Sequence, residues 1–350
     1  MPLKKRNYRE EIECALEGGR PDHMPFTAYE GHMPKDPAAR QRLMNLGLSV
    51  RRSAGVFRES TPNVAFRVEE EGHDGVRGIH RTPFGEVWKL SRKGAYDSYA
   101  PIEFYIKSKD DFKAVEFIIK DRCYETTYDE FRAVQARTGD DGVVVAGIGY
   151  SPLLELQLVW LGQENFCYMM ADAPDAVLSL YRTICEDEDK RKALVAKSPA
   201  RYVNYCGNVV PEMLGMENLR QYVEPRWKAF ADQLHAHGKK MGSHLDANNL
   251  LLLDMIRSSG MDYVEAFTPP PDCNVSVELA RRELPGRVLW INFPSSQHLT
   301  DSDNIRALTE DILRQAGDRK GVLFGITEDV PAEHIVRSYE TILSILEKGQ

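Results

Sequence analysis

From residue 142 onward, short apolar runs alternate with helical patterns, and this rhythm constrains the fold more than any other feature of the chain. Each run is followed by a segment whose apolar residues recur at helical spacing. Alternating strands and helices require a parallel sheet with right-handed crossovers. The predicted strands lie near 142–149, 200–207, 239–245, 262–269, 288–294 and 321–327.

A doubly wound open sheet and a closed barrel both fit this alternation. No G-x-G-x-x-G follows any predicted strand, so the open dinucleotide-binding sheet lacks its usual signature. A further strand at 25–29 and the length of 350 residues favour a single (β/α)8 barrel domain over 1–350. Residues 31–100 are less regular. We interpret them as a lobe or cap that contains a β-hairpin, VRGIHRTPFGEVWKL.

Composition excludes several classes of protein. The net charge of −8 argues against a nucleic-acid partner, and no apolar run reaches the roughly 18 residues that span a membrane. The N-terminal segment does not resemble a signal sequence, so we expect a soluble, cytoplasmic protein. The six cysteines are scattered without a C-x-x-C pair, which predicts free thiols. The acidic run CEDEDKRK, 185–192, is expected to form a solvated helix face.

Polar side chains gather where the predicted strands end. In a barrel these ends open onto one face, where catalytic residues lie. A set of His, carboxylate and amide groups is typical of an active site and is not what stability would select. The strand-end residues are Tyr29, Glu30, Tyr150, Ser151, Tyr205, Cys206, Asn208, His244, Asp246, Asn248, Glu265, Phe267, Asn292, Thr327 and Glu328.

His244 and Asp246 form the sharpest motif, in the segment KKMGSHLDANN. Two residues apart on extended backbone, their side chains point to the same side and can reach one metal ion or one substrate group. Imidazole with carboxylates suits Zn²⁺, and either Glu265 or Glu328 could supply a third ligand. Two other readings stay open from spacing alone. Asp246 could cap the next helix while His244 is a core residue, or the pocket could bind substrate without metal.

Three segments carry a resemblance to a known family. REEIECALEGGRPDHMPF resembles the opening of the uroporphyrinogen decarboxylase superfamily. GNVVPEMLGMENLRQYVEPRWKAFADQLHAHGKK, which leads into HLDAN, is similar to its middle segment, and FGITEDVPAEHIVRSYETI to its closing pattern. The likeness covers nearly the whole chain and implies a (β/α)8 barrel.

Departures from the family pattern separate its two activities. True decarboxylases carry arginines after the first strand, but this chain has FTAYEGHMPKD there, with Glu30 and His32 in place of cations. In the other branch, the corrinoid-dependent methyltransferases, several members bind zinc through His-x-Cys and a C-terminal cysteine. His244 matches that histidine, while Asp246 replaces the first cysteine and Thr327-Glu328 offers no cysteine. The harder set of His, Asp and Glu suits an oxygen substrate or a proton-transfer role.

The resemblance therefore predicts a methyltransferase that moves a methyl group between a small, methoxylated substrate and a corrinoid protein. Zinc, if bound, would be held by His244, Asp246 and Glu265 or Glu328; without metal, Asp246 and Glu328 would protonate the leaving oxygen. A decarboxylase of a smaller acid and a non-catalytic ligand-binding barrel are the alternatives. The sequence is compatible with a homodimer. The expected substrate contacts are Tyr29, Tyr150, Tyr205, Asn208, Asn248, Phe267, Trp290 and Asn292.

Overall fold

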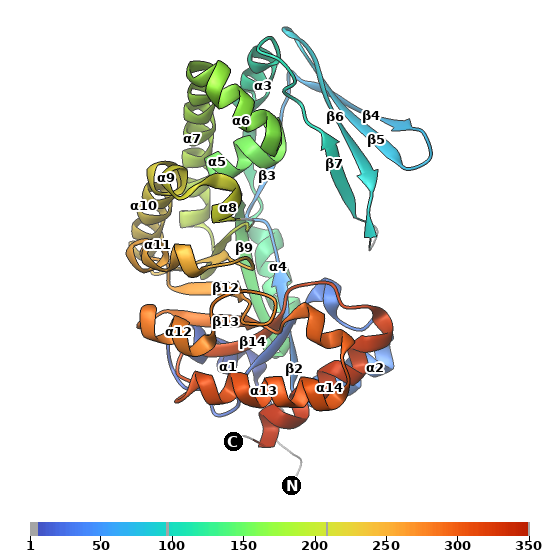
Figure 1. The fold of residues 1–350 in the computed structure, drawn as a ribbon, viewed down its shortest axis with the longest axis vertical. Coiled ribbons are helices and arrows are strands. Elements are labelled where there is room, and N and C mark those ends of the chain that lie inside the picture. Colours follow the sequence, from blue (N-terminus) through green and yellow to red (C-terminus); the bar gives the residue numbers. More distant parts are fainter. Residues whose placement is uncertain (1–5, 96–97, 208, 349–350) are drawn as a thin grey trace. The chain divides into compact units, whose positions relative to one another are not determined.

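The computed structural model describes residues 6–95, 98–207 and 209–348 (Figure 1). The chain divides into two compact units. The first unit comprises 1–56, 128–149 and 198–350, and the second comprises 57–127 and 150–197. The stretch 31–100, expected as an irregular lobe, is thus shared between the two units, and most of it forms regular strands.

Eight parallel strands close the first unit into a barrel, which confirms the predicted (β/α)8 fold (Figure 1). The barrel closes because β1 pairs with β14 on one side and with β2 on the other. The eighth strand, β2, was not predicted from the sequence. The strands are β1 Phe26–Tyr29, β2 Leu48–Ser53, β9 Gly142–Gly149, β10 Tyr202–Tyr205, β11 Lys240–His244, β12 Tyr263–Phe267, β13 Val288–Asn292 and β14 Val322–Ile326.

A layer of large side chains fills the barrel below its mouth. Tyr202, Tyr263 and Trp290 are all but inaccessible to solvent and belong to one apolar cluster, which helix α1, Tyr8–Leu16, completes with Ile12 and other apolar residues. The strand β11 makes room for this layer with a glycine. A Cβ on Gly242 would lie 2.1 Å from the Tyr263 ring. The barrel is therefore a packed core with functional space only at its carboxyl end.

Helices follow the strands of the first unit, and their caps explain many Asp and Ser residues in the connecting loops. Asp301 accepts a hydrogen bond from the Asn304 amide at the start of α13, and Ser276 does the same for α12. These helices are α2 Pro37–Asn45, α4 Tyr128–Thr138, α8 Pro211–Leu214, α9 Met216–Asn218, α10 Glu224–His235, α11 Leu253–Ser258, α12 Val277–Glu283, α13 Ser302–Ala316 and α14 Ala332–Lys348. Short 3₁₀ turns include η1 Glu30–His32, η3 Gly139–Asp141, η6 Leu250–Leu252 and η7 Ser295–Leu299, and η5 Leu219–Val223 is a π-helical segment before α10.

The second unit combines a four-stranded antiparallel sheet, a two-stranded ribbon and helices (Figure 1). Its centre is the β5–β6 hairpin, where the sequence predicts a hairpin around Pro83-Phe84-Gly85. Helix α3 packs against α7 and the sheet. The elements are β3 Phe57–Ser60, β4 Ala65–Glu71, β5 Gly75–Thr82, β6 Gly85–Lys93, β7 Tyr99–Glu103, α3 Asp111–Lys120, β8 Cys123–Thr126, α5 Pro152–Glu155, η4 Leu156–Leu161, α6 Gln163–Asp172 and α7 Pro174–Lys197.

The acidic run of α7 is not a solvated face as expected, because four of its seven charged side chains are buried in ion pairs. Asp187 is 1% exposed and pairs with Arg122, and Glu188, fully buried, lies 2.9 Å from the Lys192 amine. A charge pattern predicts an exposed helix face only when no oppositely charged group from another segment reaches it, and here Arg122, just before β8, reaches Asp187.

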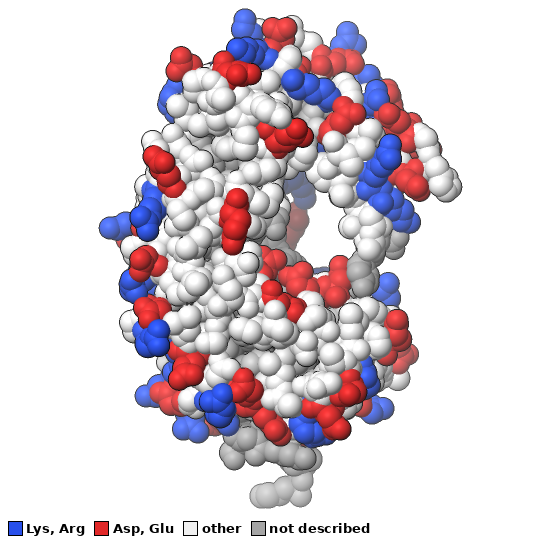
Figure 2. All heavy atoms as spheres, viewed as in Figure 1, with Lys and Arg blue, Asp and Glu red and all other residues white. Residues whose placement is uncertain are grey.

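The structure also bears on the predicted thiols, membrane segments and surface charge. The cysteines are free. None of the described helices is both long and apolar enough to cross a membrane. On the face drawn in Figure 2, Lys and Arg residues are interspersed with Asp and Glu residues, so that face carries no extended basic patch.

Candidate active site

Side chains from four strands and two loops converge at the carboxyl end of the barrel. Tyr29 ends β1, Arg51 lies in β2, His244 ends β11 and Glu265 lies in β12. Asp246 and Glu328 follow in the loops after β11 and β14. The strands bring these residues together although more than 200 positions separate Tyr29 from His244 along the chain.

One nitrogen of His244 faces a buried carboxylate. Its Nδ1 lies 2.8 Å from Oε2 of Glu265 and 3.1 Å from the Tyr29 hydroxyl. The Tyr29 hydroxyl donates to Oε1 of Glu265, and Nε of Arg51 lies 3.8 Å from the same oxygen. The Arg51 guanidinium also lies over the Tyr29 ring, 4.4 Å from its centre. These contacts fix the orientation of the imidazole ring.

The other nitrogen of His244 faces two carboxylates. Nε2 lies 3.5 Å from Oδ2 of Asp246 and 3.7 Å from Oε1 of Glu328. One ligand atom of each of the three residues lies within 4.8 Å of the others. Side-chain exposure rises from 0% at Glu265 through 21% at His244 to 40% at Glu328, so this side of the ring opens to solvent.

The electrostatics follow from burial and pairing. Burial favours neutral Glu265, but Arg51 and His244 outweigh it and lower the pKa of its carboxyl. Burial likewise opposes the charge on His244, but Asp246 and Glu265 raise its pKa to about 10. The pKa of Asp246 is lowered by His244 against the effect of burial, and that of Glu328 is raised by burial and by Asp246. Divergent pKa values of adjacent groups are typical of functional sites.

The spacing argument for His244 and Asp246 agrees with the structure, in which the two side chains face each other. Asp246 does not cap the following helix. Helix α11 begins at Leu253, and the turn η6 before it has Asn249 as its N-cap without a side-chain hydrogen bond. The capping interpretation is therefore wrong, and the Asp246 carboxylate is available to the site.

Glu265 occupies a different place from the one expected of a metal ligand. It contacts Nδ1 of His244, whereas Asp246 and Glu328 lie around Nε2. A carboxylate on the second nitrogen of a metal-binding histidine is the usual orienting partner. Of the two third ligands that the sequence left open, the geometry favours Glu328.

Sequence reasoning missed Arg51 and Gly207. Arg51 lies in β2, the strand whose two adjacent arginines obscured its apolar pattern. Gly207 follows β10 and supports His244 from the side, because a Cβ at this position would lie 2.6 Å from Cδ2 of the imidazole. A glycine directly after a strand was the available signal.

Three predicted substrate contacts serve the fold instead. Trp290 is fully buried in the core layer, and its indole N–H donates to the Thr27 hydroxyl at 2.9 Å. The Tyr205 ring packs against Phe230 of α10, 5.4 Å between ring centres, and so points out of the barrel. Because successive side chains along a strand point to opposite faces, a prediction that is wrong by one position selects a residue on the outer face, as it did with Tyr205.

Asn292 joins two strand ends. Its amide nitrogen donates to the Thr268 hydroxyl at 3.1 Å, and its oxygen accepts from the Thr327 amide at 3.0 Å. These bonds use the side chain structurally, in place of the predicted substrate contact.

The remaining predicted contacts differ in their surroundings. Phe267 is buried and Asn248 is exposed. Tyr150 belongs to the second unit. Asn208 lies outside the described residues.

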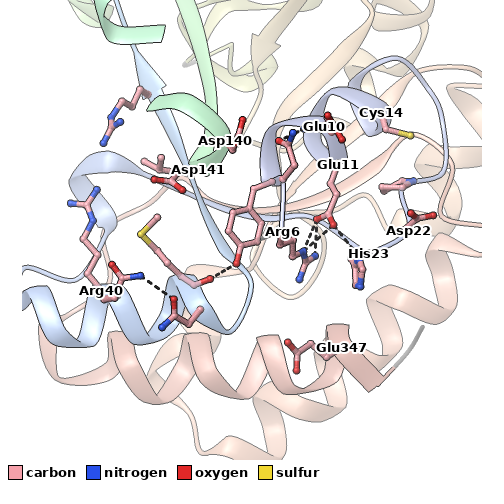
Figure 3. A pocket seen from close by; sticks show the side chains of 18 of the residues that line it. Arg6, Glu10, Glu11, Cys14, Asp22, His23, Arg40, Asp140, Asp141 and Glu347 are labelled. Carbon is pink, nitrogen blue, oxygen red and sulfur yellow. Dashed lines mark hydrogen bonds and ion pairs between the residues drawn. The ribbon is translucent and has the colours of Figure 1, made fainter. Parts of the chain in front are cut away.

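A large cavity of about 1410 Å³ lies elsewhere in the first unit, beside α1 and α2 (Figure 3). Its lining is charged, and the Glu11 carboxylate there pairs with both Arg6 and His23. It contains neither His244 nor Asp246. We assign the chemistry to the barrel mouth, where the convergent groups lie, and not to this cavity.

Comparisons with known proteins place the fold but not a family. No family model matches the chain, and no curated protein matches it. The resemblance to the uroporphyrinogen decarboxylase superfamily therefore stays a prediction.

Among solved structures, a methyltransferase from Methanosarcina mazei is 13% identical over 99% of both chains, with a TM-score of 0.58. A glycoside hydrolase family 5 enzyme from Prevotella bryantii B14 is 9% identical over 97% of this chain and 98% of its own, with a TM-score of 0.43, which is too low to carry an argument. At these identities the likeness shows that the chain shares the barrel fold of the methyltransferase.

Proposed function

We propose that the chain is a zinc-assisted methyltransferase that moves a methyl group between a small methoxylated substrate and a corrinoid carried by a partner protein. The observation that supports it best is the arrangement around His244. Two carboxylates face Nε2, and a buried carboxylate fixes Nδ1.

The residues present fit a zinc ion. His244, Asp246 and Glu328 offer one nitrogen and two oxygens, and three protein ligands leave the open position of a catalytic site. Glu265, held by Tyr29 and Arg51, would orient the histidine from behind.

The charges of the site also favour a dication. Asp246, Glu265 and Glu328 carry three negative charges when ionised, and Arg51, in contact with Glu265, supplies one positive charge. A dication would bring this group to neutrality with a neutral imidazole. A neutral substrate such as a methyl ether then meets no uncompensated charge.

In the proposed reaction, zinc would supply Lewis acidity that stabilises negative charge on the leaving oxygen, and the partner's corrinoid would accept the methyl group. The chain's own residues position the groups. Tyr29 and Arg51 hold Glu265, Glu265 holds the His244 ring, and Thr327 donates a hydrogen bond to Glu328 at 3.3 Å.

The paired state of the arginines argues against the decarboxylase alternative. Arg51 contacts Glu265, and Nη2 of Arg52 lies 2.8 Å from the Glu30 carboxylate. Both cations of β2 are therefore occupied by carboxylates of the chain, and an acidic substrate would have to displace them.

The test measures metal and methyl transfer together. We expect zinc in the purified protein and methylcobalamin formation from methoxylated donors with cob(I)alamin, and we expect both to be lost in His244→Ala and Asp246→Ala. His237→Ala and Asp254→Ala, at exposed positions, are matched controls that should retain both. Zinc and full transfer in the two site variants would refute the proposal, and carbon dioxide release from carboxylic acids would favour the decarboxylase alternative.

A further inference from the structure

We infer that Asn204 and Gly147 form a substrate-binding subsite that recognises a neutral hydrogen-bond donor. The inference rests on the proposed function, because it takes the bound molecule to be the methyl-bearing substrate. It adds a specificity-determining residue, Asn204, that neither the strand-end pattern nor the metal cluster includes.

Asn204 points into the barrel. It lies in β10 between Val203 and Tyr205, and Tyr205 packs outward against α10. Two positions earlier, Tyr202 belongs to the inner core layer. Asn204 therefore shares the inner face of the strand. Only 6% of the residue is exposed, yet its amide oxygen has no hydrogen-bond partner.

Open space lies beside this amide on one side only. In the ladders that flank β10, Asn204 pairs with Gly147 of β9 and with Gly242 of β11. The Tyr263 ring fills the place above Gly242, but a Cβ on Gly147 would meet no atom within 4 Å. Gly147 is also exposed, although it lies in a barrel strand. A buried acceptor without a partner next to accessible empty space is the arrangement expected of a ligand contact.

The subsite lies within reach of the His244 cluster. His244 is two residues beyond Gly242, the partner of Asn204. A rise of about 3.3 Å per residue and a strand spacing of about 4.8 Å place the Cα atoms of Asn204 and His244 roughly 8 Å apart. A substrate the size of one ring can therefore contact both residues.

The chemistry of the subsite indicates which group the substrate carries at the end away from its methyl ether. An amide oxygen accepts a hydrogen bond but carries no charge. The carboxylates of Asp246, in the loop after β11, and of Glu265, in β12, lie at the same end of the barrel and disfavour a further anion. The subsite thus fits a methyl ether that carries a hydroxyl group at its far end, and it disfavours the corresponding carboxylate.

Binding without the corrinoid partner tests the subsite. Calorimetric titration of the purified protein, at measured zinc content, compares 4-methoxyphenol, methoxybenzene and 4-methoxybenzoate. We expect 4-methoxyphenol to bind at least tenfold more tightly than the other two. Asn204→Ala should abolish that preference and leave methoxybenzene binding unchanged. Gly147→Leu should weaken all binding at least tenfold, with zinc content retained. Asn45→Ala, at an exposed position, is the matched control.

A preference retained in Asn204→Ala, or unchanged binding in Gly147→Leu, would overturn the inference, with thermal unfolding confirming that both variants fold. Absence of binding by all three compounds to the unsubstituted protein would overturn it as well. These experiments distinguish failure of the subsite from failure of the proposed function. If the binding pattern holds but no methyl transfer occurs, the subsite stands without that reaction. If zinc-dependent transfer occurs from other donors without this pattern, the reaction stands without the subsite.

Discussion

At the scale of single residues, the candidate site depends on contacts that orient one imidazole ring. Glu265 holds Nδ1, and Gly207 allows the chain after β10 to pass against the ring. Neither residue faces the carboxylates at Nε2, yet both decide where Nε2 points. Partners of this kind commonly change metal affinity by about 10- to 100-fold when they are altered.

A substitution at Gly207 tests this dependence. In Gly207→Ala the new methyl group would lie 2.6 Å from Cδ2 and 2.7 Å from the carbonyl oxygen of His244, so the ring must move. We expect zinc affinity to fall about 10- to 100-fold, measured by competition with a chromogenic chelator. Gly31→Ala is the control, because a Cβ there meets no atom within 4 Å. Unchanged affinity in Gly207→Ala would show that the ring position does not matter.

At the scale of elements, the second unit is tied together by a buried ionic network. Nη1 of Arg122 lies 2.8 Å from Glu155 of α5 and 3.0 Å from Asp187 of α7, and Arg191 of α7 also contacts Glu155, at 3.0 Å. Although burial opposes its charge, the two arginines lower the pKa of Glu155. The network thereby joins α5 and α7 to the segment just before β8.

Removal of one charge should loosen this unit. Glu155→Gln keeps the shape but leaves Arg122 and Arg191 with one anion fewer, which we expect to cost about 3–5 kcal/mol of unfolding free energy. Urea unfolding with hydrogen exchange over 150–197 would measure it. Glu116→Gln, which breaks an exposed pair with Lys120, should cost less than about 0.5 kcal/mol. Equal effects of the two substitutions would contradict a special role for the buried network.

At the scale of the whole molecule, each unit contains a histidine whose pKa is lowered by burial, His298 in the first unit and His80 in the second. His298 of η7 contacts the Ser338 hydroxyl of α14 at 2.6 Å, and burial lowers its pKa to about 4. In the second unit, burial together with Lys89 and Arg122 lowers the pKa of His80 to about 4. Both groups bind a proton more readily once the chain unfolds.

Acid should therefore destabilise the protein well above the range in which carboxylates titrate. Because the pKa of His298 is near 6.5 in the unfolded chain and about 4 in the folded one, its stabilising effect is complete above pH 6.5 and declines toward pH 4. The loss amounts to about 3 kcal/mol for this residue. Urea midpoints at pH 7.0, 5.5 and 4.5 should fall less steeply in His298→Asn. Parallel curves for the two proteins would refute this assignment.

The sequence alone predicted the barrel, which the structure confirms, and the centre of the candidate site. Covered strands must be apolar and helices must keep one apolar face, so their alternation can be read locally, and the His244-Asp246 spacing fixes two side chains on one side of extended backbone. The sequence did not predict β2 or the role of Arg51, because that strand places charge inside the barrel.

Tertiary structure decided the remaining roles. A shift of one residue along β10 decides whether Tyr205 or Asn204 faces the barrel interior, and in the structure Tyr205 packs outward. The position of Glu265 beside Nδ1 of His244 depends on how β12 pairs with β11. The buried charges of α7 likewise depend on partners from other elements. Such pairings depend on distances between segments far apart in the chain, which no local pattern of residues encodes.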